Sequence, residues 1–188
     1  MITGIPASGK STVARALVQR SERGVAVDGD TVRAMVRSGA VEMSPGAGDE
    51  ALAQLRLRWR ASLAVADVYL RAGFDVAFSD NVLGVMLGEL PGMVPCERFH
   101  LVVLDPEPDE VARRDRERDK TAYTDGNGSF GWLREVLASE TPRIGLWLDT
   151  TRQTPEETAA TVLRRLDESL VSAVRDDSSS GSSRTRTT

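Results

Sequence analysis

The sequence has one cysteine, Cys96, and one histidine, His100. A single cysteine excludes an internal disulfide, so the expected location is the cytoplasm. A cysteine nucleophile needs a basic partner, and His100, at the start of an apolar strand-like run, is the one histidine that could serve. We interpret both residues as structural.

Long apolar runs are also missing. No stretch approaches the ~18 residues that a membrane span needs, and no basic segment precedes an apolar one at the start, as in a signal peptide. No membrane association is therefore expected. The formal net charge is -4, and an acidic chain argues against a nucleic-acid partner. The oligomeric state cannot be read from the sequence.

Lysine is almost absent. Of the 24 lysine and arginine residues, Lys10 and Lys120 are the two lysines. Lys10 belongs to residues 4–11, GIPASGKS, which match G-x-x-x-x-G-K-[ST] at every fixed position. In this motif successive backbone N–H groups converge on a phosphate, and glycine permits the tight turn. The helical pattern that follows, VARALVQR, adds a helix N-terminus that favours an anion.

The motif assigns a role in ATP and Mg²⁺ binding to each part of this loop. Lys10 is expected to reach the β- and γ-phosphates, where it takes part in catalysis, and the Ser11 hydroxyl to bind Mg²⁺. Thr12 would support the first helical turn or contact the α-phosphate. The predicted nucleotide-binding residues of the loop are Gly4, Pro6, Ala7, Ser8, Gly9, Lys10, Ser11 and Thr12.

Short apolar runs alternate with helical patterns along the chain. The predicted strands are residues 1–3, 24–28, 74–79, 99–104 and 144–148, and the predicted helices are 10–20, about 49–72, about 107–118 and one from Thr154 onward. This alternation predicts an α/β fold with a parallel sheet and right-handed crossovers. Residues 1–174 are predicted to form one domain, and the polar residues 175–188 a disordered tail.

The second predicted strand runs into VDGDTVR, residues 27–33. Ligands of open α/β sheets bind at the carboxyl ends of strands, so this segment should face the phosphate loop. Asp30 is placed to accept the proton of an attacking hydroxyl, or to cap the following helix, and both roles can coexist. Arg33 lies on the same side and could hold an anionic or polar substrate.

The segments GIPASGKST, VDGDTVR and FSDN together resemble a group of P-loop kinases. The group includes chloramphenicol phosphotransferase, zeta toxins, adenylylsulfate kinase, gluconate kinase and the polynucleotide 5′-kinases. The resemblance implies a P-loop NTPase fold with five parallel strands in the order 2-3-1-4-5, and transfer of the γ-phosphoryl group of ATP to a hydroxyl. Its D-x-x-R element falls on Asp30 as base and Arg33 as substrate ligand, and Asp28 is the next acidic candidate.

The third predicted strand ends at Asp80. A carboxylate there can hold Mg²⁺ through water, contact the substrate, or lie in a surface turn. Asn81 is a further candidate substrate ligand.

The helix after the fourth strand carries many charges of both signs. These favour either a solvated face with i, i+4 pairs or the lid that the resemblance implies at about residues 114–130. In the second case Arg114 and Arg118 match the R-x-x-x-R spacing of arginines that stabilise the transferred phosphoryl group. After the fifth strand, Arg152 either stacks on the adenine or is an exposed loop residue.

The sequence leaves the phosphoryl acceptor open. By resemblance, an antibiotic-like natural product comes first and a sugar, sugar nucleotide or sugar acid second. Residues 38–48 and 82–95 should shape its pocket, and four methionines flank it, as pocket lining or as core. Two other functions stay as alternatives: a polynucleotide 5′-kinase, and a nucleotide-binding regulatory ATPase that has no acceptor.

Overall fold

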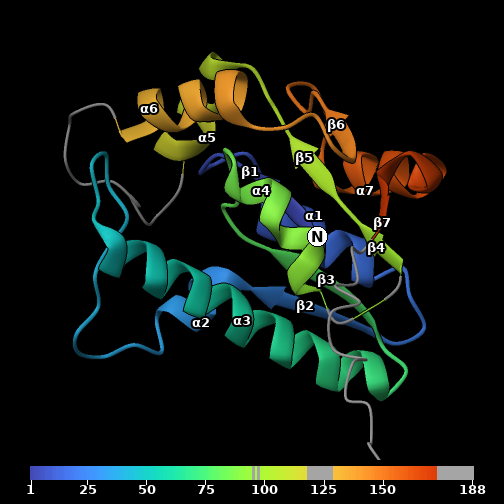
Figure 1. Cartoon of the computed structure of the whole chain (residues 1–188). Helices are drawn as coiled ribbons and strands as arrows, with labels where there is room; N and C mark the ends of the chain where they lie inside the picture. Colours follow the sequence, from blue (N-terminus) through green and yellow to red (C-terminus); the bar gives the residue numbers. More distant parts are fainter. Residues whose placement is uncertain (95, 97, 118–128, 173–188) are drawn as a thin grey trace, which may run out of the picture.

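The computed structural model describes residues 1–94, 96, 98–117 and 129–172 (Figure 1). The elements follow in the order β1 (Ile2–Gly4), α1 (Lys10–Val18), β2 (Gly24–Asp28), α2 (Gly29–Arg33), α3 (Asp49–Arg71), β3 (Asp75–Ser79), α4 (Met86–Glu89), η1 (Leu90–Met93), β4 (Arg98–His100), β5 (Val102–Leu104), α5 (Pro108–Arg116), α6 (Ser129–Glu135), the π-helical turn η2 (Val136–Glu140), β6 (Leu146–Leu148), α7 (Pro155–Arg164), η3 (Leu166–Ser169) and β7 (Leu170–Ser172). The predicted α/β fold is confirmed.

Five parallel strands form the main sheet in the order β2-β3-β1-β5-β6. The predicted order was 2-3-1-4-5, and the labels differ because the predicted strand 99–104 is in fact two strands. Residues 98–100 leave the main sheet and pair antiparallel with β7 as β4, while residues 102–104 continue as the parallel strand β5. Counted in chain order among the parallel strands, β5 is the fourth and β6 the fifth.

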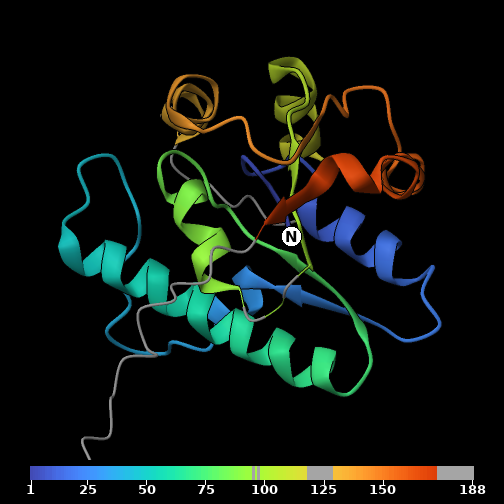
Figure 2. The same ribbon diagram turned by 45° about the vertical axis from the view of Figure 1, so that its right-hand side comes forward.

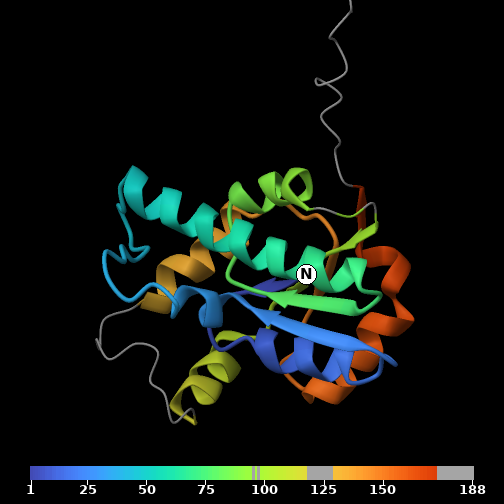
Figure 3. The ribbon, with the colours of Figure 1, turned by 90° about the horizontal axis from the view of Figure 1, so that it is seen from below.

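Helices cover both faces of the sheet (Figures 2 and 3). Helix α3 packs on β2 and β3 from one side. Helix α1 packs on the same strands from the other side, and α7 packs against α1. Alternate residues of one strand therefore enter different cores: Val103 lies in the core under α3, and its neighbours Val102 and Leu104 lie in the core under α1. This two-sided burial explains why the strands are continuously apolar.

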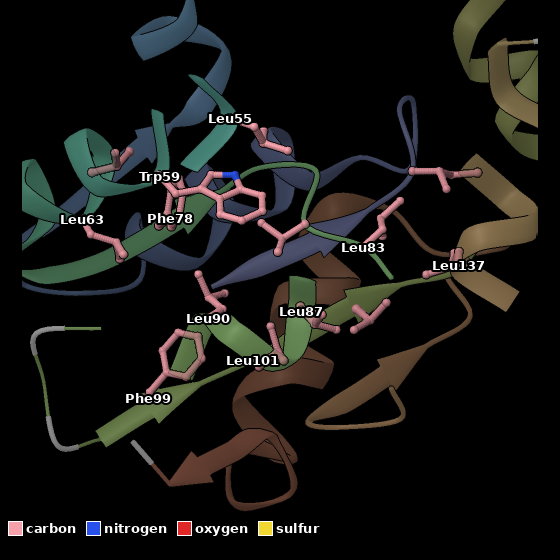
Figure 4. Packing of buried hydrophobic residues seen from close by; sticks show 14 of the residues in the cluster. Leu55, Trp59, Leu63, Phe78, Leu83, Leu87, Leu90, Phe99, Leu101 and Leu137 are labelled. Atoms are coloured by element: carbon pink, nitrogen blue, oxygen red, sulfur yellow. The ribbon is translucent and has the colours of Figure 1, made fainter. Parts of the chain in front are cut away.

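The larger core lies between α3 and the sheet. Trp59 is fully buried there in one cluster with Leu63, Phe78 and Leu87 (Figure 4). Because its indole is buried, Trp59 cannot present a stacking surface to a nucleic acid, and its place on the apolar stripe of α3 is a matter of packing.

Helix α7, predicted from Thr154 onward, begins with a capping box. The Thr154 hydroxyl accepts from the Glu157 backbone N–H, and the Glu157 carboxylate accepts from the Thr154 backbone N–H. The predicted disordered tail lies outside the described residues, as does most of the predicted lid. None of the described helices has the length and apolar character to cross a bilayer.

Candidate active site

The loop between β1 and α1 has the backbone of a phosphate cradle. Gly9 adopts φ 97°, a left-handed conformation that favours glycine, and the Val13 N–H donates to its carbonyl (2.9 Å) as α1 begins. The Lys10 ammonium donates to the Ile5 carbonyl (2.8 Å), which draws its side chain back over the loop. The loop amides and this ammonium are therefore gathered at the N-terminus of α1, which attracts an anion.

Two buried hydroxyls beside this loop support a polar ligand. Ser8 Oγ and Thr150 Oγ1 have no hydrogen-bond partner within the described residues, although both side chains are almost completely buried. Both residues line a cavity of about 570 Å³ that also contains Thr12 and Arg152. A buried hydroxyl without a partner is costly, so this cavity suits a ligand that hydrogen-bonds, as a nucleotide does.

A second and larger cavity, of about 1040 Å³, opens on the other side of the same loop. It is lined by Lys10 and Ser11 at the loop and by Asp30 and Arg33 from α2. Ala7 of the phosphate loop borders both cavities. Both cavities therefore adjoin the phosphate loop.

Asp30 and Arg33 lie together at the edge of the larger cavity. The Arg33 guanidinium is 3.6 Å from the Asp30 carboxylate and 2.7 Å from that of Glu42. Asp30 does not cap α2. That role belongs to Asp28, whose carboxylate accepts from the Asp30 backbone N–H (3.0 Å), so the Asp30 side chain is left exposed to the cavity. Asp28 is absent from the lining of both cavities.

Comparison with known proteins places this site in a family. Residues 1–141 of the 188-residue chain match the model of a family described as an AAA domain. The chain belongs to this AAA domain family. A search of curated proteins gives no match.

Solved structures share the fold of this AAA domain at low sequence identity. A tunicamycin resistance protein from Deinococcus radiodurans has a TM-score of 0.60 and 14% identity, and covers 90% of this chain and 95% of its own. The APS kinase from Mycobacterium tuberculosis, solved with AMPPNP and APS, has a TM-score of 0.58 and 20% identity, and the match covers 88% of this chain and 95% of the kinase. A sugar kinase from Janibacter sp. has a TM-score of 0.57 and 20% identity, and the match covers 89% of this chain and 92% of the sugar kinase. The P-loop kinase fold inferred from the motifs is thus confirmed.

Asp80 of this AAA domain is not a free carboxylate. It is almost fully buried and forms a two-pronged ion pair with Arg58 of α3, at 2.7 and 2.9 Å. Burial raises the pKa of the Asp80 carboxyl, and Arg58 opposes this rise. Gly29 leaves room for this carboxylate, because a side chain there would overlap it. Arg58 also lines the larger cavity, and the pair ties α3 to the residue that follows β3.

Replacing Arg58 by methionine should unfold the protein more easily. The variant leaves the Asp80 carboxylate buried without its cation, which costs about 3 kcal/mol of unfolding free energy. The deficit should shrink as the pH falls, because a carboxyl whose pKa is raised by burial takes up its proton in the folded state first. Urea denaturation at several pH values measures both effects.

Arg56→Met is the matched control for this variant. Arg56 lies on the same helix and pairs with Glu89 (3.0 Å), but both side chains are well exposed. Exposed pairs contribute little, so this variant should unfold near the wild-type midpoint. Equal destabilisation by the two substitutions would show that the Arg58–Asp80 pair has no special structural weight.

Ser79 lies beside the predicted metal ligand Ser11, and the sequence analysis did not identify this neighbour. It is the buried last residue of β3, and its hydroxyl donates to Ser11 Oγ at 3.4 Å. Among the described residues, no cluster of three or more His, Cys, Asp or Glu side chains is placed to hold a metal. The donors present suit Mg²⁺ held by Ser11, the nucleotide phosphates and water. A role for Asp80 in holding Mg²⁺ through water, or in contacting the substrate, stays a prediction.

Arg114 joins the two walls of the smaller cavity. Its guanidinium donates to the Ser8 carbonyl (3.1 Å), to the Thr150 carbonyl (2.7 Å) and to the Glu110 carboxylate (2.7 Å). Hydrogen bonds from Arg113 and then Arg114 lower the pKa of Glu110 to about 2. Arg114 therefore fastens the phosphate loop to the loop after β6, and its predicted contact with the transferred phosphoryl group remains untested.

Substitution of Arg114 by methionine separates these two roles. If the guanidinium mainly holds the cavity walls, the affinity for Mg·ATP should fall about tenfold, the value of one charged hydrogen bond, with a smaller change in kcat. A loss of kcat at unchanged ATP affinity would instead favour the catalytic role. Nucleotide titration and steady-state kinetics on the same preparation distinguish the outcomes. The control is Arg116→Met, because Arg116 is an exposed residue of the last turn of α5 that lines neither cavity.

Most of the other predicted site residues lie at one of the two cavities. Thr12, Ser8 and Gly9 line the smaller cavity with Arg152, and Asn81 lines the larger one. Pro6 also borders the larger cavity, and Gly4 ends β1 beneath the loop. Arg118 lies outside the described residues.

Several lining residues were missed by the sequence analysis. Trp132, Leu133 and Val136 enter the larger cavity from α6 and η2, beyond the predicted lid. Arg58 was not among the candidate site residues. Its spacing carried the signal, because it lies three residues after buried Leu55 and four before buried Ser62.

Cys96 and His100 form hydrogen bonds with other groups and not with each other. Cys96 Sγ donates to the Arg98 carbonyl, and His100 Nδ1 lies 3.2 Å from the Leu166 carbonyl and 3.0 Å from Ser169 Oγ. Burial raises the pKa of the Cys96 thiol and lowers that of His100. These contacts suit structural roles and disfavour a thiolate.

Proposed function

We propose that this AAA domain is an ATP-dependent kinase that transfers the γ-phosphoryl group to a hydroxyl of a small molecule. The observation that carries this proposal is that two cavities adjoin the phosphate loop. One contains buried hydroxyls without a partner among the described residues, and the other contains an exposed carboxylate, Asp30. A regulatory ATPase has no use for the second cavity or for a base in it.

In the proposed reaction Lys10 and the loop amides hold the β- and γ-phosphates, while Ser11 contributes a metal ligand. Bound Mg²⁺ neutralises phosphate charge. Asp30 accepts the proton of the acceptor hydroxyl as the new oxygen–phosphorus bond forms, and the bond to the β–γ bridging oxygen breaks to release ADP. Arg33 stabilises the position of Asp30 from 3.6 Å and lies where it can contact the acceptor.

The acceptor class follows from weaker support. The similar structures include a sugar kinase and a tunicamycin resistance protein, which supports a sugar or an antibiotic-like natural product as acceptor. Asn81 at the larger cavity is the proposed hydroxyl ligand beside Asp30. The single cysteine supports a cytoplasmic location.

Transfer of label from ATP carrying radioactive phosphorus at the γ position to a panel of antibiotics, sugars and oligonucleotides tests the proposal. Labelled product from a small hydroxyl compound is the expected result. Labelling of oligonucleotides alone, with binding that falls steeply with salt, would support the polynucleotide 5′-kinase instead. Hydrolysis without any labelled acceptor would favour the regulatory ATPase.

A further inference from the structure

Large apolar side chains are exposed to solvent inside the larger cavity. Met35 is 66% exposed and Leu57 is 62% exposed, and both line this cavity together with exposed Val36 and Val41. They come from separate elements, the segment after α2 and helix α3, which lie on the same side of the molecule as α6 (Figures 1 and 3). Apolar side chains that converge on a cavity favour an apolar ligand.

Other residues that line the larger cavity are also apolar. Met43, Met86 and Leu83 line it, and Trp132 and Leu133 enter from α6. Methionine adapts to ligands of irregular shape. The volume of about 1040 Å³ is at the upper end of small-molecule sites, which span roughly 300–1,000 Å³, so the cavity has room for more than a single sugar ring.

The charged residues of the cavity do not favour an anionic acceptor. Arg33 already faces two carboxylates, Asp30 and Glu42, and Arg58 is held by Asp80. Glu50 lines the cavity as a further carboxylate. An acceptor carrying a phosphate, sulfate or carboxylate would have to displace these partners, at a cost in desolvated charge.

We propose that the acceptor is a hydroxyl compound with an extended apolar surface and no anionic group. This inference rests on the proposed kinase function and deepens it. The hydroxyl lies at the polar end of the cavity, near Asp30 and Asn81, whose Oδ1 is buried without a partner among the described residues. The apolar body covers Met35, Leu57 and Trp132.

Binding of Nile red, a neutral apolar fluorophore, tests the cavity without knowledge of the acceptor. We expect saturable binding of one equivalent to the full chain. Leu57→Gln should raise its Kd roughly five- to tenfold, since one large apolar side chain no longer covers the probe. Val68→Gln is the control, because Val68 lies on the same helix at 66% exposure but outside the cavity, and its Kd should stay within twofold of wild type.

Displacement of Nile red by hydroxy acids and by their methyl esters, which neutralise the carboxylate and add one carbon, tests the charge. Each pair shares one hydroxyl, and the esters should displace the probe at concentrations at least tenfold lower. Absence of saturable Nile red binding, equal effects of the Leu57 and Val68 variants, or displacement by the acids at equal or lower concentrations would each overturn the inference.

Mg·ATP binding, measured on the same preparations, separates this inference from the proposed function. Mg·ATP binding without Nile red binding would refute the apolar acceptor and leave the kinase proposal standing. Nile red binding that Leu57→Gln weakens, in a protein that does not bind Mg·ATP, would support an apolar cavity and refute the kinase proposal on which the acceptor role depends.

Discussion

Replacement of Lys10 by alanine should reduce phosphoryl transfer by at least about a thousandfold, the scale of losing a preorganised charge at the transferring group. The Lys10 ammonium donates to the Ile5 carbonyl of the same loop, and Lys10 lines the larger cavity. Its loss removes the one side-chain cation that the motif directs at the β- and γ-phosphates. Labelled phosphate transfer to the best acceptor of the panel measures the effect.

The matched control removes a positive charge elsewhere. Arg165→Ala deletes an exposed arginine that pairs with Glu168 after α7, and its transfer rate should equal that of wild type. If Lys10→Ala retained more than a tenth of the wild-type rate, with an unchanged melting temperature, the cradle would not be the site of transfer.

Replacement of Asp30 by asparagine should lower kcat by ~10²–10⁴, the range for loss of a general base. Asparagine has nearly the same volume as aspartate, and the α2 cap is unaffected because Asp28 provides it. Mg·ATP binding should therefore persist while transfer falls. Single-turnover kinetics at saturating nucleotide separate the chemical step from binding.

Asp67→Asn controls for the loss of a carboxylate on the surface, where Asp67 pairs with Arg71, and should leave kcat unchanged. Full ATP turnover in the Asp30 variant, combined with its loss in the Lys10 variant, would contradict the kinase proposal and favour a regulatory ATPase.

The elements that the sequence predicted well have local signals. The phosphate loop follows from a motif whose backbone geometry only a few residue types permit, and α7 follows from the Thr154–Glu157 capping box. Helix α3 follows from a sustained apolar period, and it begins at Asp49, as predicted.

The strand 99–104 shows where local signals fail. Apart from His100 it is apolar, but the Leu101 backbone donates to the Ser169 carbonyl and accepts from the Leu146 N–H. The pairing of the chain therefore changes there from β7 to the main sheet. Apolar character is the same on both sides of Leu101, and only partners distant in the sequence distinguish them. The Arg58–Asp80 ion pair could not be predicted from the sequence for the same reason, since the two residues are 22 positions apart.

The comparisons show the fold of the chain but do not identify an acceptor, so the acceptor proposal rests on the residues that line the larger cavity. One similar structure is an APS kinase solved with APS, yet the arginines that line the acceptor cavity here already face carboxylates. In the proposed kinase, acceptor choice would depend on the side chains that line the larger cavity from α2, α3, α6 and the segment between α2 and α3, on a scaffold that different acceptors can share.

Calorimetric titration of the wild-type chain with Mg·ATP tests the central claim most directly. The account predicts one saturable site per chain, with heat that disappears in the Lys10→Ala variant and persists in Asp30→Asn. A folded wild-type protein that releases no binding heat across a range of temperatures, or one that binds equally well without Lys10, would contradict it.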